Sequence, residues 1–450
     1  YRLTSTIFSC EEALKNRRRA PVYRLTSTIF SCEEALKNRR RAPVYRLTST
    51  IFSCEEALRN HIYTELTKYF DNIIDELKAI VKDEGVLLFF IVLPIAYPLI
   101  YSWIYNNEVV REVPVVLVDD SHTAMSREFS RKFDASPDVI IALRALSMAE
   151  AQNMIGRGQA YGILYFPHDF DKNIGRLEQS HVSIYCDMSY MLTYKAILQS
   201  ATAVASEMGM EVQKKMLGNH TKRDDEIATR PLYFDEVPLF NTTGGYGNFV
   251  LPGVLVLIIQ QALLLGVGMI NGTRREERLR NPYPTSLKGW YSWGEAVSTL
   301  LGQTTAYLMV FSVMLAWITL VVPRIFGFVS MVHGLDLLLF FTPYLLACVF
   351  FAVCFSSLVR YRESVMLVVV FTSLPMLFMS GISWPQSSIP GVWQGVSCLF
   401  PCTFAIRGFI RMSSMGALLG DVATEYHAMW VLVAIYGSLA LIITKLRTRV

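Results

Sequence analysis

The sequence predicts an α-helical integral membrane protein with six transmembrane helices plus a small extracytoplasmic α/β domain. Several stretches of about 20 residues carry almost no charge, and this is the length an α-helix needs to cross a ~30 Å hydrocarbon core. The charges gather instead in residues 1–85, 106–240 and 271–289, and the second of these ranges alternates strands with helices. With 52% hydrophobic residues and a net charge of only +4, the chain suits a lipid bilayer and carries no nucleic-acid-binding signature.

The first part of the chain repeats itself. Residues 1–22 recur without a change at 23–44 and begin a third time at 45–58. Structural repeats drift between copies, so perfect identity indicates a recent DNA duplication, an artefact or a disordered segment. No methionine precedes Met125, so the chain as given lacks its natural start. We keep residues 1–58 out of the functional argument.

An amphipathic helix is expected in residues 59–85, directly before the first span. Its apolar side chains follow the i, i+3, i+4, i+7 rule: Phe70, Ile73, Ile74, Leu77, Ile80 and Val81. The charged side chains are expected on the remaining face: Asp71, Asp75, Glu76, Lys78 and Lys82. Such a helix can lie in the membrane interface or pack on a soluble partner, and its fusion to a span favours the interface.

The six spans are expected at residues 86–105, 249–270, 293–322, 337–358, 364–380 and 429–444. Lys and Arg gather before the first span, in 271–289, between the fourth and fifth spans and after the sixth. The positive-inside rule makes that side cytoplasmic. Both termini are then cytoplasmic, residues 106–248 form the extracytoplasmic domain, and residues 249–450 form a transmembrane domain with five spans. The location expected is a cell membrane, most simply the bacterial inner membrane.

The extracytoplasmic domain is expected to hold strands at 113–118, 139–143, 160–166 and 181–186. Helices are expected at 123–134, 147–158 and 190–217, the second opened by a capping box of Ser147 and Glu150. Acidic and histidine side chains follow the strands and could be read as a metal or acid–base set: Asp119, Asp120, His122, Asp169 and Asp187. Each lies at a strand end or turn, where Asp favours local hydrogen bonds. We therefore expect neither a metal site nor catalytic residues.

Three stretches of the sequence, in this order, resemble the membrane permease subunit of type-2 ABC exporters: 78–105, 115–170 and 379–411. The likeness is to the bacterial drug-export-like branch, which has a large extracytoplasmic domain between its first two spans, and it covers about residues 69–450. It implies that ATP and Mg bind to a separate ATP-binding subunit, and that this chain holds no cofactor. It also implies a homodimer, or a heterodimer with a similar permease, and a membrane-fusion partner protein bound through the extracytoplasmic domain.

The resemblance implies functional roles for three groups of residues. The cytoplasmic loop 271–289 would couple to the ATP-binding subunit through Arg274, Arg275, Glu276, Glu277 and Arg278. The order of these charges departs from the family's charge pattern. A solvated loop that contacts no partner is the alternative. An outer re-entrant gate in 380–411 would include Ser380, Gly381, Trp384, Pro385, Ile389, Pro390, Pro401 and Arg407. The second and fifth spans would face a second permease, with these small residues of the second span at the interface: Gly253, Ala262, Gly266 and Gly268.

The gate hypothesis also has a physical basis. Prolines interrupt helical hydrogen bonding, and irregular backbone persists at membrane depth only inside protein or along a cavity. Two short re-entrant helices would satisfy residues 380–411, and an ordinary outer loop is the alternative.

The expected function is that of an ABC exporter permease moving an apolar or amphiphilic substrate. No phosphate-binding loop occurs in the sequence, so ATP hydrolysis is assigned to a partner. Ionisable residues such as Glu295 and Asp336 lie near span ends, which argues against proton coupling. The main alternative is a membrane-anchored sensor or assembly scaffold whose extracytoplasmic domain binds a ligand. A membrane enzyme would need a convergent polar set that the spans lack.

Overall fold

The computed structural model describes residues 67–446, with gaps at 108, 177, 219–220, 231–236, 238, 242–243, 281–292, 329 and 360. The repeats of residues 1–58 lie outside the described residues. The chain divides into two compact units. The α/β unit is Asn107–Tyr246, and the helical unit contains the described residues on either side of it.

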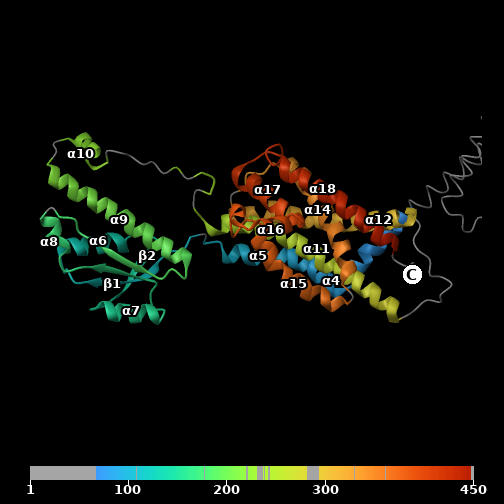
Figure 1. The fold of residues 1–450 in the computed structure, drawn as a ribbon, viewed down its shortest axis with the longest axis horizontal. Helices are drawn as coiled ribbons and strands as arrows, with labels where there is room; N and C mark the ends of the chain where they lie inside the picture. Colours follow the sequence, from blue (N-terminus) through green and yellow to red (C-terminus); the bar gives the residue numbers. More distant parts are fainter. Residues whose placement is uncertain are drawn as a thin grey trace, which may run out of the picture. The chain divides into compact units, whose positions relative to one another are not determined.

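The helical unit contains six helices that are long and apolar enough to cross a membrane, which confirms the predicted fold class. They are Glu84–Ile104, Tyr246–Arg280, Trp293–Phe326, Gly334–Leu358, Arg362–Met379 and Ala423–Leu446. A further helix over residues 67–82, here called the elbow helix, precedes the first span. Figure 1 shows the spans running side by side as one bundle.

Two spans are interrupted by a π-helical turn. The first span consists of α4 (Glu84–Leu87), the π turn Leu88–Val92 and α5 (Leu93–Ile104). The third consists of α12 (Trp293–Ala316), the π turn Trp317–Val321 and α13 (Val322–Phe326). Each π turn ends two residues before a proline near the start of the following helix, Pro94 or Pro323. A proline ring clashes with the carbonyl four residues earlier, and a widened turn relieves that clash.

The second span, α11 (Tyr246–Arg280), is the central helix of the bundle. Of its most apolar window 89% is buried, against 22% for the fifth and sixth spans, α15 (Arg362–Met379) and α18 (Ala423–Leu446). The fourth span, α14 (Gly334–Leu358), packs against α11, where the buried Tyr344 hydroxyl donates to the Val256 carbonyl at 2.7 Å. Residues 271–280, expected in a loop, instead continue α11 as a helix. Residues 281–289 of that expected loop lie outside the described residues.

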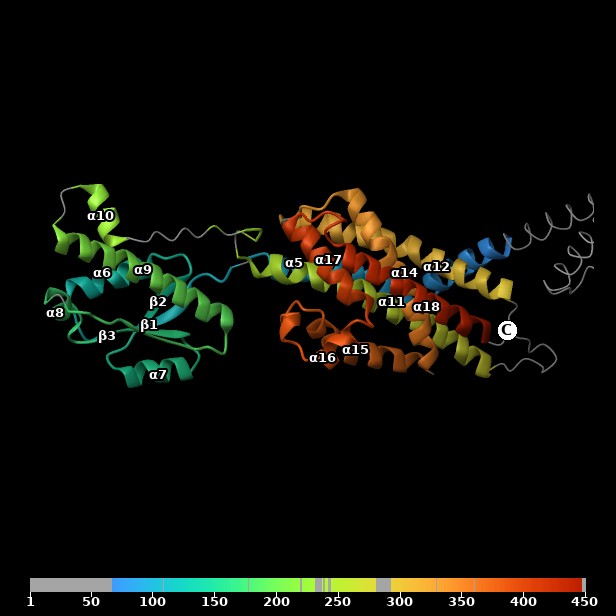
Figure 2. The same cartoon turned by 45° about the horizontal axis from the view of Figure 1, so that its top comes forward.

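The segment after the fifth span forms two helices, α16 (Gly391–Ser397) and α17 (Pro401–Met415). A single 3-10 turn, Gln386–Ser388, precedes them. Figure 2 shows α16 beside α15, with which it is in contact. We call residues 380–415 the α16–α17 segment. It contains one helix of seven residues and one of 15.

The α/β unit is a four-stranded sheet with helices on both faces. Its strands are β1 (Val113–Asp119), β2 (Val139–Arg144), β3 (Gly162–Phe166) and β4 (Ser183–Cys186), in the order β2-β1-β3-β4. β1 pairs in parallel with β2 and β3, and β4 is antiparallel to β3. Successive β1 side chains point to opposite faces, so Val115 and Leu117 enter one apolar core and Val116 and Val118 the other.

Helices cover the two faces of this sheet unequally. Helices α6 (Ala124–Asp134), α8 (Phe170–Gly175) and α9 (Met191–Leu217) cover one face, and α7 (Met148–Gly156) covers the other (Figure 1). The short helices α8 and α10 (Lys222–Thr229) were not expected from the sequence. Ser147 caps α7 through the Glu150 amide, but the Glu150 carboxylate accepts from the Leu146 amide, so the capping box is only half formed.

Candidate functional site

A set of charged side chains converges at the end of the helical unit where α11 finishes. We call it the charge cluster, and it consists of Glu76, Asp83, Arg274, Glu276 and Arg362. Glu76 belongs to the elbow helix, and Asp83 lies between that helix and α4. Arg274 and Glu276 belong to α11, and Arg362 belongs to α15. The cluster therefore joins three parts of the chain that are far apart in the sequence: residues 76–83, α11 and α15.

Glu76 is buried, with 2% of its surface exposed, and its carboxylate is fully occupied. The Arg274 guanidinium donates to both oxygens, at 2.6 Å to Oε2 and 3.3 Å to Oε1. Tyr307 of α12 donates its hydroxyl to Oε1, and Gln303 Nε2 donates to Oε2 at 3.4 Å. A buried carboxylate is costly unless it is paired and hydrogen-bonded. These donors therefore hold the elbow helix against α11 and α12.

Asp83 and Arg362 form the second pair of the cluster. Both guanidinium nitrogens donate to the carboxylate at 2.6 Å, which is the bidentate geometry that suits arginine. Asp83 also caps α4 by accepting from the amides of Gly85 and Val86. Burial acts to raise the pKa of Asp83, but the hydrogen bonds from Arg362 and these amides outweigh it and hold the pKa below its ordinary value.

Arg362 also binds the end of α11. Its backbone amide donates to Glu276 Oε1 at 2.9 Å, and its Nη1 donates to Thr273 Oγ1 at 3.1 Å. A Cβ on Gly85 would lie 2.7 Å from Arg362 Nη2, so this side chain crosses close to the start of α4. The first, second and fifth spans are thus tied together at one point.

Arg275 links α11 to the last turn of α14. It donates Nη1 to the Val359 carbonyl at 2.7 Å and Nη2 to the Ser357 carbonyl at 3.4 Å. Carbonyls at a helix C-terminus lack intrahelical partners, so an arginine there satisfies them. Arg274, Arg275 and Glu276, all expected to contact a partner, are therefore engaged within the chain.

The tip of α11 beyond these contacts is exposed. Glu277 and Arg280 face solvent, and Leu279 keeps 71% of its surface exposed. Arg278 is partly buried and makes interactions of its own. Of the five residues expected to couple to the ATP-binding subunit, Glu277 is thus the most available. We call Glu277, Leu279 and Arg280 the α11 tip.

The residues expected in the outer gate all lie on turns and helix ends of the α16–α17 segment, except Arg407. Ser380 ends α15 and is buried, Gly381 has φ +92°, Pro385 and Ile389 flank the 3-10 turn, Pro390 precedes α16, and Pro401 is the first residue of α17. Trp384 is exposed and donates Nε1 to the Ser388 carbonyl at 3.4 Å. Gly381 is required because L side chains rarely adopt that φ.

The α16–α17 segment is anchored to the middle of α11. Gln260 of α11 accepts from the Cys402 amide at 2.9 Å, so it satisfies one of the free donors at the start of α17. Its Nε2 lies 3.5 Å from the Met376 sulfur of α15. Arg407 of α17 has its Nε and Nη2 buried, with no hydrogen-bond partner among the described residues. Its Cζ lies 5.9 Å from the centre of the Phe404 ring.

A family model described as "ABC-2 family transporter protein" matches residues 85–442. The chain belongs to this family. The match covers most of the chain, including Arg274, Glu276 and Arg362, whereas Glu76 and Asp83 lie just before it. No curated protein matches the sequence. The chain is accordingly the membrane subunit of an ABC transporter, with six spans and an additional α/β unit.

In this ABC-2 transporter the small residues expected at a dimer interface pack inside the chain. A Cβ on Gly253 would lie 1.9 Å from Ile382, one on Gly266 would lie 1.8 Å from Phe90, and one on Gly268 would lie 2.4 Å from Val365. Ala262 is completely buried. The proposed α11 face is therefore wrong as a surface for a second permease, because it already accommodates side chains of the first span, α15 and the α16–α17 segment.

Asp119 and Asp187 of the α/β unit make the local hydrogen bonds expected of them, whereas Asp169 makes no cap bond to α8. Asp119 accepts from the amides of Ser121 and His122, and Asp187 accepts from the Ser189 amide. Asp120 accepts from the Tyr165 hydroxyl at 3.1 Å. Among the described residues, no group of three or more His, Cys, Asp or Glu side chains could hold a metal ion.

Sequence reasoning missed three members of the charge cluster. Glu76 was placed on the polar face of the elbow helix, but it follows Ile73 and precedes Ile80 in an i, i+3, i+7 series that the structure buries. That spacing was the available signal. Arg362 was counted only as a positive-inside residue, and no local pattern links it to Asp83, 279 positions away.

Proposed function

We propose that the chain is the permease subunit of an ABC exporter, powered by a separate ATP-binding subunit that carries ATP and Mg. The observation that supports it best is the charge cluster beside the exposed α11 tip. A partner that moved the tip would move the elbow helix and the first, second and fifth spans together, because Arg274, Glu276 and Arg362 connect them. The end that carries the cluster is the cytoplasmic end under the positive-inside rule.

The substrate proposed is apolar or amphiphilic. The interior of the bundle is built mainly from aliphatic and aromatic side chains, and Gln260 and Gln261 bring polar groups into the buried part of α11. The α16–α17 segment is proposed as a re-entrant gate on the extracytoplasmic side. Its anchoring to α11 through Gln260 supports a path from the α11 tip to the gate.

A second permease, identical or similar, is proposed to pack against α15 instead of α11. Large apolar side chains form an exposed stripe along α15, at i, i+3, i+4 spacing: Met366, Leu367, Val370, Phe371, Leu374 and Phe378. Lipid would cover the same stripe in a single chain. Cysteines along this stripe should cross-link between subunits with helical periodicity, and lipid exposure alone predicts no cross-link.

The α/β unit is proposed to be extracytoplasmic, as in the drug-export-like branch, and to bind a membrane-fusion partner protein. Exposed apolar side chains follow the edge strand β4 and continue into α9: Tyr185, Met188, Tyr190, Met191 and Leu192. An exposed group of this kind favours protein contact. A sensor or assembly scaffold would use the same surface, but it would need no ATP-binding subunit.

The function is tested by assembly with an ATP-binding subunit and by ATP hydrolysis. The full chain co-expressed with the ABC-type ATP-binding subunit of its own cell should yield a complex that hydrolyses ATP in nanodiscs. Replacing Leu279→Glu and Arg280→Glu together should weaken the complex, because a docking surface depends on complementary contacts. The matched control is Arg223→Glu in the exposed helix α10, which should have no effect. ATP-driven transport at the normal rate in the tip variant would contradict the proposal.

A further inference from the structure

The two faces of the elbow helix have different surroundings. One face carries Ile73, Glu76 and Ile80, which are buried against the bundle. The opposite face carries Ile74 and Val81, with 47% and 68% of their surface exposed. Apolar side chains exposed in a contiguous group indicate a contact that the isolated chain does not supply.

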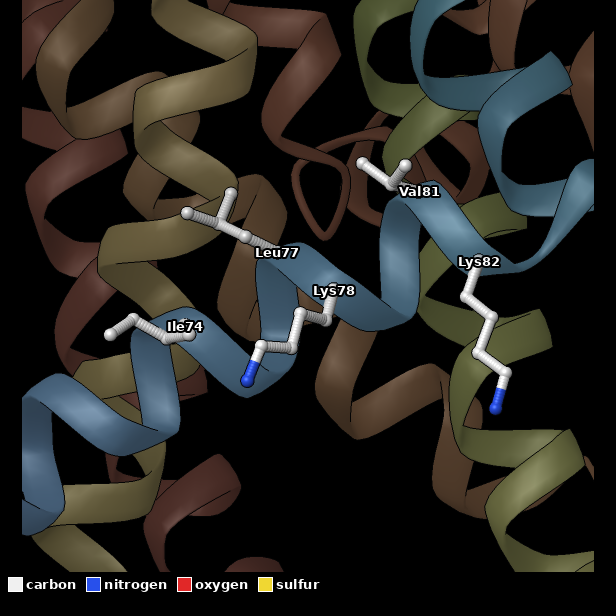
Figure 3. Close-up of a pocket in the computed structure, with 5 residues that line it drawn as sticks. All are labelled: Ile74, Leu77, Lys78, Val81 and Lys82. Atoms are coloured by element: carbon white, nitrogen blue, oxygen red, sulfur yellow. The ribbon is translucent and has the colours of Figure 1, made fainter.

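Two lysines flank this exposed apolar face. Ile74, Leu77, Lys78, Val81 and Lys82 together line a shallow hollow on the surface of the elbow helix. Figure 3 shows the two lysine side chains extending on one side of the helix, with Leu77 and Val81 on the other side. Residues four apart lie on one face of a helix with roughly 5–6 Å between their Cβ atoms. Both ammonium groups can therefore reach one anionic group.

The last six residues of the elbow helix, 77–82, contain Lys78 and Lys82 and no acidic residue. Lys78 lies 3.5 Å from Asp75, in an ion pair whose side chains are both 72% exposed, and exposed pairs of this kind bind weakly. Within the described residues Lys82 makes no ion pair. Asp71 and Asp75 lie earlier in the helix, Asp83 is occupied by Arg362, and the exposed Glu84 begins α4. The positive charge of the two lysines is thus left for an external anion.

The first span, which follows the elbow helix directly, also exposes apolar side chains. α4 begins at Glu84, one residue after Asp83, and Leu88 and Val92 of the π turn keep 49% and 44% of their surface exposed. Lysines beside an apolar stripe at the end of a span lie at the depth of lipid headgroups. The occupant that matches both the apolar and the charged part of the hollow is a phospholipid with a net negative headgroup.

We infer that the elbow helix carries a binding site for an anionic phospholipid. The phosphate lies between the Lys78 and Lys82 ammonium groups, and an acyl chain lies along Ile74, Leu77 and Val81. Because the opposite face of the same helix holds Glu76 against Arg274, a bound lipid also presses the elbow helix toward the charge cluster. This site requires only the membrane location of the chain, so it does not depend on the identity of the transported substrate.

The test is lipid retention by the full chain. The purified chain is placed in nanodiscs of phosphatidylcholine containing a minority of phosphatidylglycerol, extracted, and analysed by native mass spectrometry for the retained lipids. Wild type should retain phosphatidylglycerol preferentially. Each lysine near an anionic surface contributes about 1 kcal/mol, so Lys78→Gln with Lys82→Gln should lower that preference by roughly 25-fold. Lys78→Arg with Lys82→Arg keeps both charges and should keep most of the preference.

Two controls make the result specific. Lys214→Gln with Lys215→Gln removes two exposed lysines from α9 and should leave the preference unchanged. Glycerol phosphate added at millimolar concentration should not displace the lipid, because it lacks the chain that fills the apolar hollow. Equal phosphatidylglycerol retention by wild type and the double glutamine variant would overturn the inference. Full displacement by glycerol phosphate would also overturn it, since the site would then be one for free phosphate.

Discussion

The polar groups of the charge cluster are hydrogen-bonded, whereas several buried polar atoms of the α16–α17 segment are not paired within the described part of the chain. In the charge cluster Glu76, Asp83 and Arg362 each have several partners within 3.5 Å. In the α16–α17 segment, Arg407 Nε and Nη2 and Thr403 Oγ1 are buried without a hydrogen-bond partner among the described residues. Buried polar groups are ordinarily satisfied. The charge cluster is thus closed by its own hydrogen bonds, whereas the α16–α17 segment keeps polar atoms that the described residues leave unpaired, which supports the gate proposed there.

Helix α11 connects these two regions. Arg274 and Gln260 are 14 residues apart, which corresponds to roughly 21 Å along a helix. Gln260 holds the first turn of α17, and Arg274 holds the elbow helix. A rigid displacement of α11 is therefore transmitted from one region to the other.

The largest effect is expected from breaking the buried pair of the charge cluster. Glu76→Ala leaves the Arg274 guanidinium and the Tyr307 hydroxyl without their acceptor, and loss of one partner of a buried pair costs about 3–5 kcal/mol. The apparent unfolding midpoint in detergent should fall steeply. Glu277→Ala, on the exposed α11 tip, is the control and should stay within roughly 0.5 kcal/mol of wild type. Similar unfolding midpoints for both variants would show that the buried Glu76–Arg274 pair does not stabilise the fold.

The contact between α11 and α17 should produce a smaller effect. Gln260→Leu removes the acceptor for the Cys402 amide, and an unsatisfied buried donor costs about 1–3 kcal/mol. Gln261→Leu is the matched control, because Gln261 Oε1 is buried with no partner in the described part of the chain. The control should be neutral or stabilising. A larger loss for Gln261→Leu than for Gln260→Leu would contradict the proposed connection.

The pH dependence of stability should reveal how much the charge of Asp83, paired with Arg362, contributes to stability. The pKa of Asp83 is lowered from 3.8 on folding, so its contribution is present above that value and is lost as the pH falls through the lowered pKa. Asp83→Asn keeps an N-cap residue but removes the charge. Its unfolding midpoint should lie below that of wild type at neutral pH and converge with it in acid. A constant difference at every pH would show that the pair contributes no charge effect.

The smallest effect on stability is expected at Arg407. Arg407→Met removes nitrogens that have no partner, so the unfolding midpoint should stay the same or rise slightly. Arg411→Met, one turn away on α17, breaks a contact of 3.4 Å with Glu425 and should lower the midpoint. If Arg407 serves the transport cycle, its variant should lose transport while keeping its fold. Normal transport by Arg407→Met would show that Arg407 and its unpaired nitrogens have no role in transport.

Much of the helical unit could be predicted because span length and hydropathy are local properties. All six spans were expected, and the first five begin within three residues of their predicted starts. The end of α11 was placed ten residues too early, at 270 instead of Arg280. The charged residues that follow 270 indicated a loop, but their partners on the elbow helix, α14 and α15 keep them helical.

The remaining errors of the sequence-based prediction concern residues whose surroundings depend on contacts with distant parts of the chain. Gly266 is small because Phe90 of the first span crosses it, and a stripe of small residues cannot reveal whether its neighbour belongs to the same chain. Glu76 is buried because Arg274 and Tyr307 lie opposite it, about 200 positions away in the sequence. The short helix α8 contains only six residues, too few for a periodic pattern.

Cross-linking from the α11 tip tests the central claim most directly. A single cysteine replacing Leu279, in a cysteine-free background, is treated in native membranes with a short thiol cross-linker beside an equivalent variant at Lys222 of α10. The account predicts that position 279 cross-links to a subunit that binds and hydrolyses ATP, that ATP changes the yield, and that position 222 gives no such product. Cross-linking of the ATP-binding subunit from position 222 and not from position 279 would contradict the account.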